Sequence, residues 1–204
     1  GRTELMHSIF GLTKPDSGKL ILNGEEVEFK TPRDAIQHGI AYVTEDRKGE
    51  GLVLPMSVEK NITIASLRSF LNRKAIRAHA AELIEKFDVR PRGCEEAPAG
   101  TLSGGNQQKV VLAKWMIAGP NVLIFDEPTR GIDVGAKKEI YVLMNELAKK
   151  GMAIIMISSE MPELLGMCDR IYVMSEGRLA GEFTAEEATQ ERIMASIMQE
   201  QNKK

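Results

Sequence analysis

Two short segments of the sequence combine residue types whose spacing could support chemistry on an anion. The first, Leu102–Gln108, reads Leu-Ser-Gly-Gly-Asn-Gln-Gln and lies where a loop leads into a helix that is predicted to run to about residue 118. The glycines Gly104 and Gly105 leave backbone N–H groups uncovered at a helix N-terminus, where unpaired donors and the helix dipole favour a bound phosphate. The hydroxyl of Ser103 can add one more donor. Taken alone, the same residues are equally typical of an ordinary helix cap.

The second segment places two acids at the end of an apolar strand. Asp126 and Glu127 follow Val122–Phe125 and precede Pro128, which prevents further strand pairing. Because an unpaired buried carboxylate is costly, adjacent acids at such a place favour a functional role over two solvated acids. The chemistry that fits is an Asp126 that orders Mg²⁺ through water and a Glu127 that polarises the water attacking a γ-phosphate.

The elements that must position these segments follow an α/β pattern. Strands are predicted at residues 40–43, 122–125 and 153–157, and each is fed by a helix. That alternation is typical of a mainly parallel sheet covered by helices. The sequence therefore predicts an α/β core with both motifs at its loops.

Smaller elements surround this core. Strands at residues 19–22 and 27–30 are predicted to form an antiparallel hairpin that turns at Asn23-Gly24. An amphipathic helix is predicted at Lys74–Phe87. A final helix is predicted from Ala185, because Thr184 and Glu187 have the spacing of a capping box.

Composition excludes several classes of protein. The chain has 204 residues, 43% of them hydrophobic, and a net charge of -2, which gives no basic field for a nucleic-acid backbone. Its longest apolar runs are far shorter than the roughly 20 residues of a membrane-spanning helix. Cys94 and Cys168 lack the paired spacing of a metal site or a redox couple. We therefore expect a globular protein without nucleic acid as a partner, whose membrane association runs through another protein.

Three segments resemble the motifs of ABC ATPases, in the order that family uses. Leu102–Gln108 resembles the signature motif, Val122–Glu127 the Walker B strand and Gly131–Asp133 the D-loop. The resemblance implies a P-loop NTPase-like core that binds ATP and Mg²⁺. It also implies a single nucleotide-binding domain over 1–204, with a helical subdomain at 46–101 and, at 102–204, the signature, Walker B strand and C-terminal core.

The family pattern extends to the start of the chain, with departures. Gly1, Arg2 and Thr3 look like the last positions of a Walker A loop, so its strand and most of its glycines are expected to precede Gly1. Arg2 replaces the lysine of that loop, which is not a conservative exchange. Glu45 stands at the glutamine of the Q-loop, and Ser159 at a histidine that contacts the γ-phosphate. The resemblance thus assigns catalytic roles to Glu127 and Ser159, nucleotide contacts to Gly1, Arg2, Thr3, Ser103, Gly104, Gly105, Gln107 and Asp133, and metal contacts to Thr3, Glu45 and Asp126.

The departures resemble one branch of the family. The sequence resembles the C-terminal cassette of fused ATPase subunits of bacterial simple-sugar importers. This resemblance is carried by Arg2 and by residues 45–52, 103–109, 130–135 and 158–163. That resemblance implies import of a monosaccharide and a place on the cytoplasmic face of the inner membrane. The implied partners are an N-terminal cassette of the same polypeptide, paired head-to-tail with this one, membrane permease subunits and, indirectly, a periplasmic sugar-binding protein.

Two other functions stay open. One is a soluble ABC ATPase of chromosome maintenance or translation, but only about a hundred residues without sustained heptads separate Gly1 from Ser103, and basic extensions are missing. The other is a non-hydrolytic cassette that completes the site of a partner, which is compatible with the transport function.

Overall fold

The chain divides into two compact units. The computed structural model describes residues 1–66 and 73–202. The first unit comprises residues 1–34 and 156–204, and the second comprises residues 35–155. Residues 67–72, inside the predicted helical subdomain, lie outside the described part.

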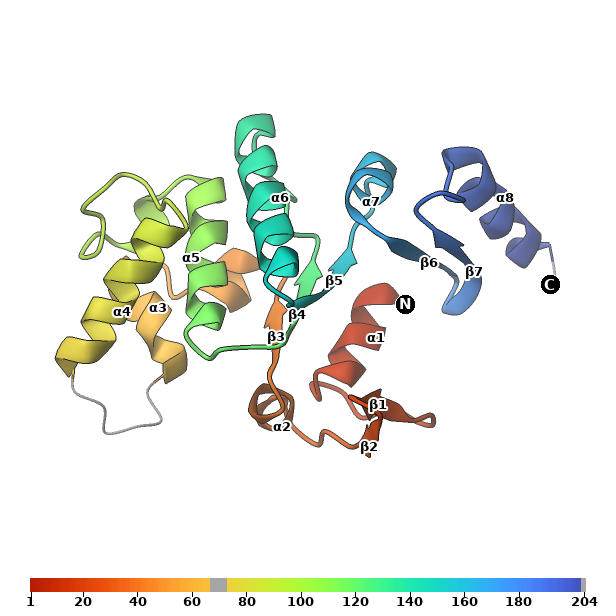
Figure 1. The fold of residues 1–204 in the computed structure, drawn as a ribbon, viewed down its shortest axis with the longest axis horizontal. Helices are drawn as coiled ribbons and strands as arrows, with labels where there is room; N and C mark the ends of the chain where they lie inside the picture. Colours follow the sequence, from red (N-terminus) through yellow and green to blue (C-terminus); the bar gives the residue numbers. More distant parts are fainter. Residues whose placement is uncertain (67–72, 203–204) are drawn as a thin grey trace. The chain divides into compact units, whose positions relative to one another are not determined.

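A three-stranded sheet forms the centre of the second unit (Figure 1). Its order is β3 (Ile40–Val43), β4 (Val122–Asp126) and β5 (Ala153–Ile157), and the unit boundary falls within β5. β3 and β4 are parallel, with Ile40 opposite Val122 and Val43 opposite Phe125. All four residues of β3 and the last four of β4 are buried, as expected for apolar strands covered on both faces. The three strands predicted for this sheet are present.

Helices and irregular turns complete the second unit. In helix α5 most residues between Gly105 and Ala113 are buried. In α6 the buried residues form a stripe of Ile140, Met144 and Leu147. The predicted apolar stripe of α4 is buried at Ala80, Leu83 and Ile84. The elements are α2 (Pro32–Gln37, which crosses the unit boundary), the π-helical turn η1 (Arg47–Gly51), α3 (Val58–Thr63), the 3-10 turns η2 (Ile64–Ser66) and η3 (Ala99–Thr101), α4 (Arg73–Lys86), α5 (Gly104–Met116) and α6 (Val134–Lys149).

Within the described residues, the first unit consists of two hairpins and three helices in addition to its share of α2 and β5. Its small apolar core joins Ile171 and Val173 of one hairpin to Ile193 of the last helix. The elements are α1 (Arg2–Ile9), β1 (Leu20–Leu22), β2 (Glu25–Val27), α7 (Met161–Met167), β6 (Arg170–Ser175), β7 (Arg178–Thr184) and α8 (Gln190–Gln201).

Two local predictions need correction. The hairpin turns at Asn23-Gly24, both with positive φ, as predicted, but a two-residue turn makes the second strand start at Glu25, so it is Glu25–Val27 rather than 27–30. The last helix begins at Gln190 and not at Ala185, because Thr189 supplies its cap. The predicted pair of Thr184 and Glu187 does form its hydrogen bonds, at 3.0 and 3.2 Å, but they hold the turn after β7.

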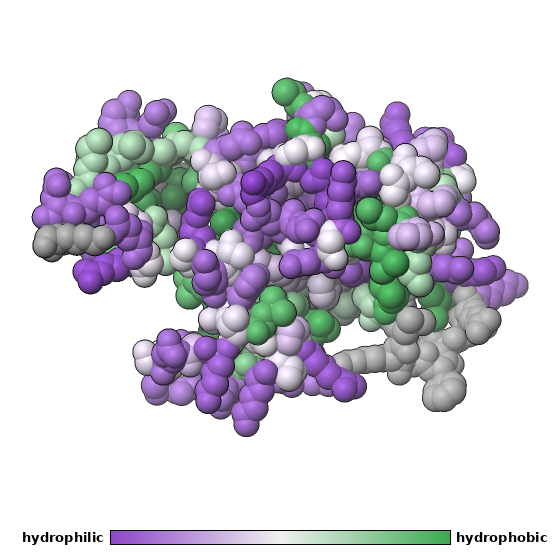
Figure 2. All heavy atoms as spheres, turned by 180° about the vertical axis from the view of Figure 1, so that it is seen from behind, coloured by the Kyte–Doolittle hydropathy of each residue, from purple (hydrophilic) through white to green (hydrophobic). Residues whose placement is uncertain are grey.

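The surface is largely hydrophilic, with apolar atoms in separate patches, on the face that Figure 2 shows. In the part of the chain that the structure describes, no helix combines the length and the apolar character needed to cross a membrane.

Candidate functional site

The end of strand β4 carries the two predicted acids. Asp126 is the last residue of β4 and is 0% exposed. The hydroxyl of Tyr42, on the neighbouring strand β3, donates a hydrogen bond to its Oδ2 at 2.6 Å. Glu127 follows with a φ of 47°, a left-handed conformation that is uncommon for residues other than glycine. Such a conformation persists where surrounding structure enforces it, which is typical of functional sites.

Tyr42 was not among the residues predicted for this site. Its only signal was a hydroxyl-bearing side chain in an otherwise apolar strand, Ile40–Val43. Burial, followed by the hydrogen bond to Asp126, raises the pKa of Tyr42 well above its ordinary value of 10.0. Tyr42 therefore stays protonated as the donor that supports Asp126.

Replacing Tyr42 by phenylalanine is expected to lower the free energy of unfolding by about 1–3 kcal/mol, because Asp126 loses a buried donor. Urea unfolding at neutral pH measures this change. The raised pKa of Tyr42 also makes its contribution pH-dependent. Unfolded tyrosine ionises near 10.0, so this contribution is present below that pH and is lost as the pH rises above it.

The decline in stability above pH 10 should consequently be shallower in Tyr42→Phe than in the wild type. Tyr172→Phe is the matched control, because Tyr172 is 50% exposed. Equal stability losses in the two variants would contradict a special role for Tyr42.

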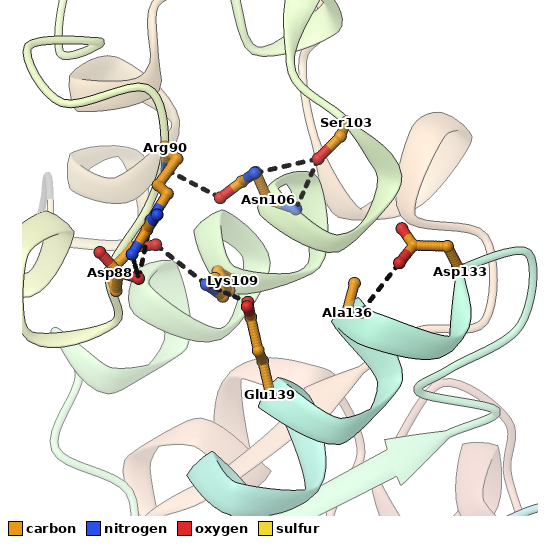
Figure 3. Close-up of polar contacts among 8 residues, drawn as sticks. All are labelled: Asp88, Arg90, Ser103, Asn106, Lys109, Asp133, Ala136 and Glu139. Atoms are coloured by element: carbon orange, nitrogen blue, oxygen red, sulfur yellow. Dashed lines mark hydrogen bonds and ion pairs between the residues drawn. The ribbon is translucent and has the colours of Figure 1, made fainter.

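The signature segment is arranged around the N-terminus of α5. Ser103 caps the helix, and its Oγ accepts hydrogen bonds from the backbone N–H of Asn106 at 3.5 Å and from Asn106 Nδ2 at 2.9 Å (Figure 3). Since the oxygen acts as acceptor in both, the hydroxyl hydrogen is available to donate elsewhere. The side chain of Ser103 is exposed, so this donor can reach a ligand.

A polar network holds Asn106 and α5 in place. Asn106 Oδ1 accepts from the backbone N–H of Arg90 at 2.7 Å. One turn further on, Lys109 is 3% exposed, yet its Nζ donates to the Asp88 carbonyl at 2.9 Å and forms an ion pair of 2.7 Å with Glu139 of α6 (Figure 3). A buried ammonium is tolerated when it is paired in this way. The loop at residues 88–90, α5 and α6 are thereby joined behind the signature segment.

The two glycines of the signature meet different neighbours. A Cβ on Gly105 would lie 2.5 Å from the Cβ of Ala136, so glycine is needed for the close approach of α5 and α6. A Cβ on Gly104 would lie 2.9 Å from Nη2 of Arg47, the far end of a long side chain.

Gln107 points inward. It is 3% exposed, its Nε2 donates to the carbonyls of Leu102 at 3.1 Å and Ala99 at 3.4 Å, and its Oε1 has no hydrogen-bond partner among the described residues. Its predicted nucleotide contact stays a prediction, whereas its support of the loop before Ser103 is direct.

The segment after Glu127 leads to a second helix cap. Asp133 caps α6, with its Oδ1 accepting from the backbone N–H of Ala136 at 3.0 Å (Figure 3). Glu45, predicted as a metal contact, forms an ion pair with Arg130. Asp133, Glu45 and the Asp126–Glu127 pair all belong to the second unit.

The remaining predicted residues belong to the first unit. Gly1 caps α1, and Arg2 and the half-buried Thr3 form its first turn. Nη1 of Arg2 donates to the carbonyl of Ser158 at 2.8 Å, which brings the start of the chain next to the residue before Ser159. Ser159 itself is exposed.

Ser158 is fixed from its other side. Its hydroxyl donates to Oε2 of the buried Glu163 at 2.7 Å and accepts from the backbone N–H of Glu160 at 3.0 Å. The backbone carbonyl that receives Arg2 is thus part of a rigid turn.

The candidate metal contacts are oxygen donors. Within residues 1–66 and 73–202, no three His, Cys, Asp or Glu side chains cluster to hold a metal ion. Mg²⁺ that accompanies a nucleotide needs only one or two protein carboxylates, because phosphates and water fill the rest of its shell. Asp126 and Glu45 are oxygen donors of the required kind, so the residues fit an ion that arrives with ATP.

A comparison with known families bears on these motifs. The sequence model of the ABC transporter family matches residues 1–130 of the chain. The chain belongs to the ABC transporter family. The segments predicted to hold Walker A positions, the Q-loop, the signature and the Walker B strand all lie within that match, and the predicted family membership is confirmed.

Curated relatives and a solved structure agree with this membership. The ribose import ATP-binding protein RbsA of Oceanobacillus iheyensis is 53% identical over 199 residues, and that of Bacillus subtilis is 52% identical over 200 residues. Each alignment covers 95% of this chain and 40% of the relative, so the chain spans about two fifths of their length. The structure of cbiO1 from Clostridium perfringens, part of the ABC transporter complex cbiONQ, is 24% identical and has a TM-score of 0.79, covering 95% of this chain and 76% of that one. This likeness confirms the predicted ABC ATPase fold.

Proposed function

We propose that this chain is the second ATP-binding cassette of the ATPase subunit of a bacterial monosaccharide importer, and that it acts chiefly by closing the ATP site of a partner cassette. The observation that carries the proposal is the geometry of Ser103. Its oxygen is occupied as an acceptor by Asn106, its hydrogen is left to donate, and the backbone N–H groups of a helix N-terminus lie beside it. Such a preorganised set of donors suits the charge that builds on a transferred phosphoryl group.

The chemistry divides between two sets of residues. Ser103, Gly104 and Gly105 supply donors to a γ-phosphate bound by the partner cassette. At the end of β4, Asp126 would hold, through water, the Mg²⁺ that accompanies ATP, and Glu127 accepts a proton from the attacking water. When bound, the ion would neutralise phosphate charge. Asp133 positions the start of α6, next to the cassette interface.

The site built on this cassette's own loop is proposed to be the weaker one. Gly1, Arg2 and Thr3 would meet the phosphates and Glu45 and Thr3 the metal, with Ser159 at the γ-phosphate. Arg2 already donates to a backbone carbonyl in this structure, so phosphate binding would require its guanidinium to be shared or released. A cassette that completes its partner's site without hydrolysing ATP is therefore the second candidate function.

The proposed partners follow from the relatives. Those relatives are named ribose import ATP-binding proteins and are about two and a half times as long as this chain, which leaves room for another cassette in one polypeptide. A permease would receive the apolar residues near η1 and α3, where Val53 is 45% and Met56 is 37% exposed. We propose that this contact holds the cassette at the cytoplasmic face of the inner membrane, with a periplasmic sugar-binding protein acting indirectly.

Paired glutamate variants in the full-length subunit test this assignment. Glu127→Gln is expected to lower ATP hydrolysis only several-fold, because the site it belongs to contributes little turnover. The matching change in the other cassette should cost about 10²- to 10⁴-fold, the usual range for losing a general base. ATP hydrolysis by the transporter in membranes, measured side by side for the two variants, shows whether the two sites are unequal.

Equal losses in both variants would mean that both sites turn over, and the asymmetric assignment would be wrong. If neither variant lost ATPase activity, Glu127 could not be assigned as a catalytic base.

A further inference from the structure

The turn η1 is locked by its own side chains. Asp46 caps it, with Oδ1 accepting from the backbone N–H groups of Lys48 at 3.1 Å and Gly49 at 2.9 Å. A Cβ on Gly49 would lie 2.5 Å from Oδ2 of Asp46, so the turn requires glycine there. At its far end, Nζ of Lys114 on α5 donates to the Gly51 carbonyl at 2.8 Å. These hydrogen bonds make η1 a rigid turn, so a displacement of η1 is transmitted to the residues that its side chains contact.

Arg47, the first residue of η1, reaches across to the segment that follows the two acids. Its Nη1 donates to the carbonyl of Arg130 at 2.7 Å, and its Nη2 donates to the carbonyl of Gly131 at 3.2 Å. Gly131 has a φ of 66°, and this left-handed turn presents the two successive carbonyls to one guanidinium. Only arginine has the planar fork that can span both acceptors.

The same guanidinium also lies against the signature segment. Nη2 of Arg47 is the atom that a Cβ on Gly104 would meet at 2.9 Å. Arg47 thus contacts the backbone of residues 130 and 131 and borders the first residue of α5, all within one unit of the chain.

The burial of the Arg47 guanidinium is energetically unfavourable, which favours a specific role for this contact. Burial lowers the pKa of Arg47, and its Nε is buried without a hydrogen-bond partner among the described residues. A buried unsatisfied donor is unfavourable by about 1–3 kcal/mol. An exposed arginine elsewhere on the surface would avoid this cost.

We propose that Arg47 is a positioning residue that couples η1 to residues 130 and 131, and through them fixes Glu127 and Asp133. The inference rests on the proposed function, since it concerns the efficiency of that same ATPase. Backbone hydrogen bonds carry the coupling onward: the N–H of Arg130 donates to the Glu127 carbonyl at 3.1 Å, and that of Ile132 to the Thr129 carbonyl at 3.3 Å. A displacement of η1 then shifts the acid and the cap of α6 together.

The test uses the full-length subunit assembled with its permease. Arg47→Ala is expected to lower the kcat of ATP hydrolysis several-fold, no more than Glu127→Gln does, because it acts through the position of Glu127, with KM for ATP within about twofold. Arg47→Lys retains one charged donor and should recover part of the kcat. Arg192→Ala is the matched control, because Arg192, in α8, also donates to a backbone carbonyl, that of Glu187 at 2.8 Å.

Amide hydrogen exchange gives a readout that does not need activity. In Arg47→Ala the amides of Arg130 and Ile132 should exchange at least about tenfold faster, while the rest of the chain keeps its rates. Unchanged kcat together with unchanged exchange would overturn the inference. So would faster exchange throughout the chain with no recovery by lysine, since that pattern indicates a general loss of stability. A wild-type subunit without ATPase activity would refute the proposed function instead, and the exchange rates would still decide whether Arg47 holds the segment.

Discussion

Replacing Ser103 by arginine in the full-length subunit is expected to lower ATP hydrolysis and sugar transport by about 100- to 1,000-fold. The hydroxyl hydrogen of Ser103 is left to donate because Asn106 occupies its oxygen from two sides. Arginine removes that donor from the place where charge builds on the γ-phosphate, and its long side chain fills the space that the phosphate would take. Hydrolysis and uptake in membranes measure the loss.

A cap is lost in this variant as well, so a control is needed. Thr189 caps α8 in the same way, accepting from the backbone N–H of Arg192 at 3.2 Å. Thr189→Arg should cost a similar amount of stability, about 0.5–2 kcal/mol, with little effect on hydrolysis. Ser103→Thr keeps both the hydroxyl and the cap and should remain active. A Ser103→Arg variant as active as Thr189→Arg would rule out the phosphate contact of the signature segment.

The parts of the site that could be predicted from the sequence are those set by local chemistry. Ser103 and the two glycines indicate a helix N-terminus. Asp126 and Glu127 indicate a functional site, because acids rarely end a buried strand. The contacts that tune these residues could not be predicted. Tyr42 and Asp126 are 84 positions apart, and Arg47 and Gly131 are also 84 apart, so only the parallel pairing of β3 and β4 and the folding of η1 bring them together.

The direction in which a side chain points also cannot be predicted from its place in a motif. Gln107 lies in the signature segment, but its phase on α5 turns it toward the carbonyls of Ala99 and Leu102. The pair Thr184 and Glu187 shows the same limit for helix caps. Its hydrogen bonds form with the predicted spacing, yet the helix starts at Gln190 with Thr189 as its cap, because a capping spacing stabilises a turn as readily as a helix.

A large loss of stability is also expected from Gly105→Ala. The new Cβ would lie 2.5 Å from the Cβ of Ala136, and both atoms belong to short side chains on packed helices, so α5 and α6 must separate. Overpacking of this kind costs about 1–3 kcal/mol. In a chain of 204 residues each 1 kcal/mol lowers Tm by roughly 2–4 °C. Thermal and urea unfolding of the variant measure the change.

Gly166→Ala provides a control with the opposite sign. Gly166 lies inside α7, and, apart from its chain neighbours and the backbone of the helix itself, no atom of the described residues lies within 4 Å of a Cβ placed there. Alanine should stabilise the chain at that position by about 0.4–1 kcal/mol, because it restricts the unfolded state without a clash. If Gly105→Ala were instead as stable as Gly166→Ala, α5 and α6 could not be in the close contact on which the placement of Ser103 and Asp133 depends.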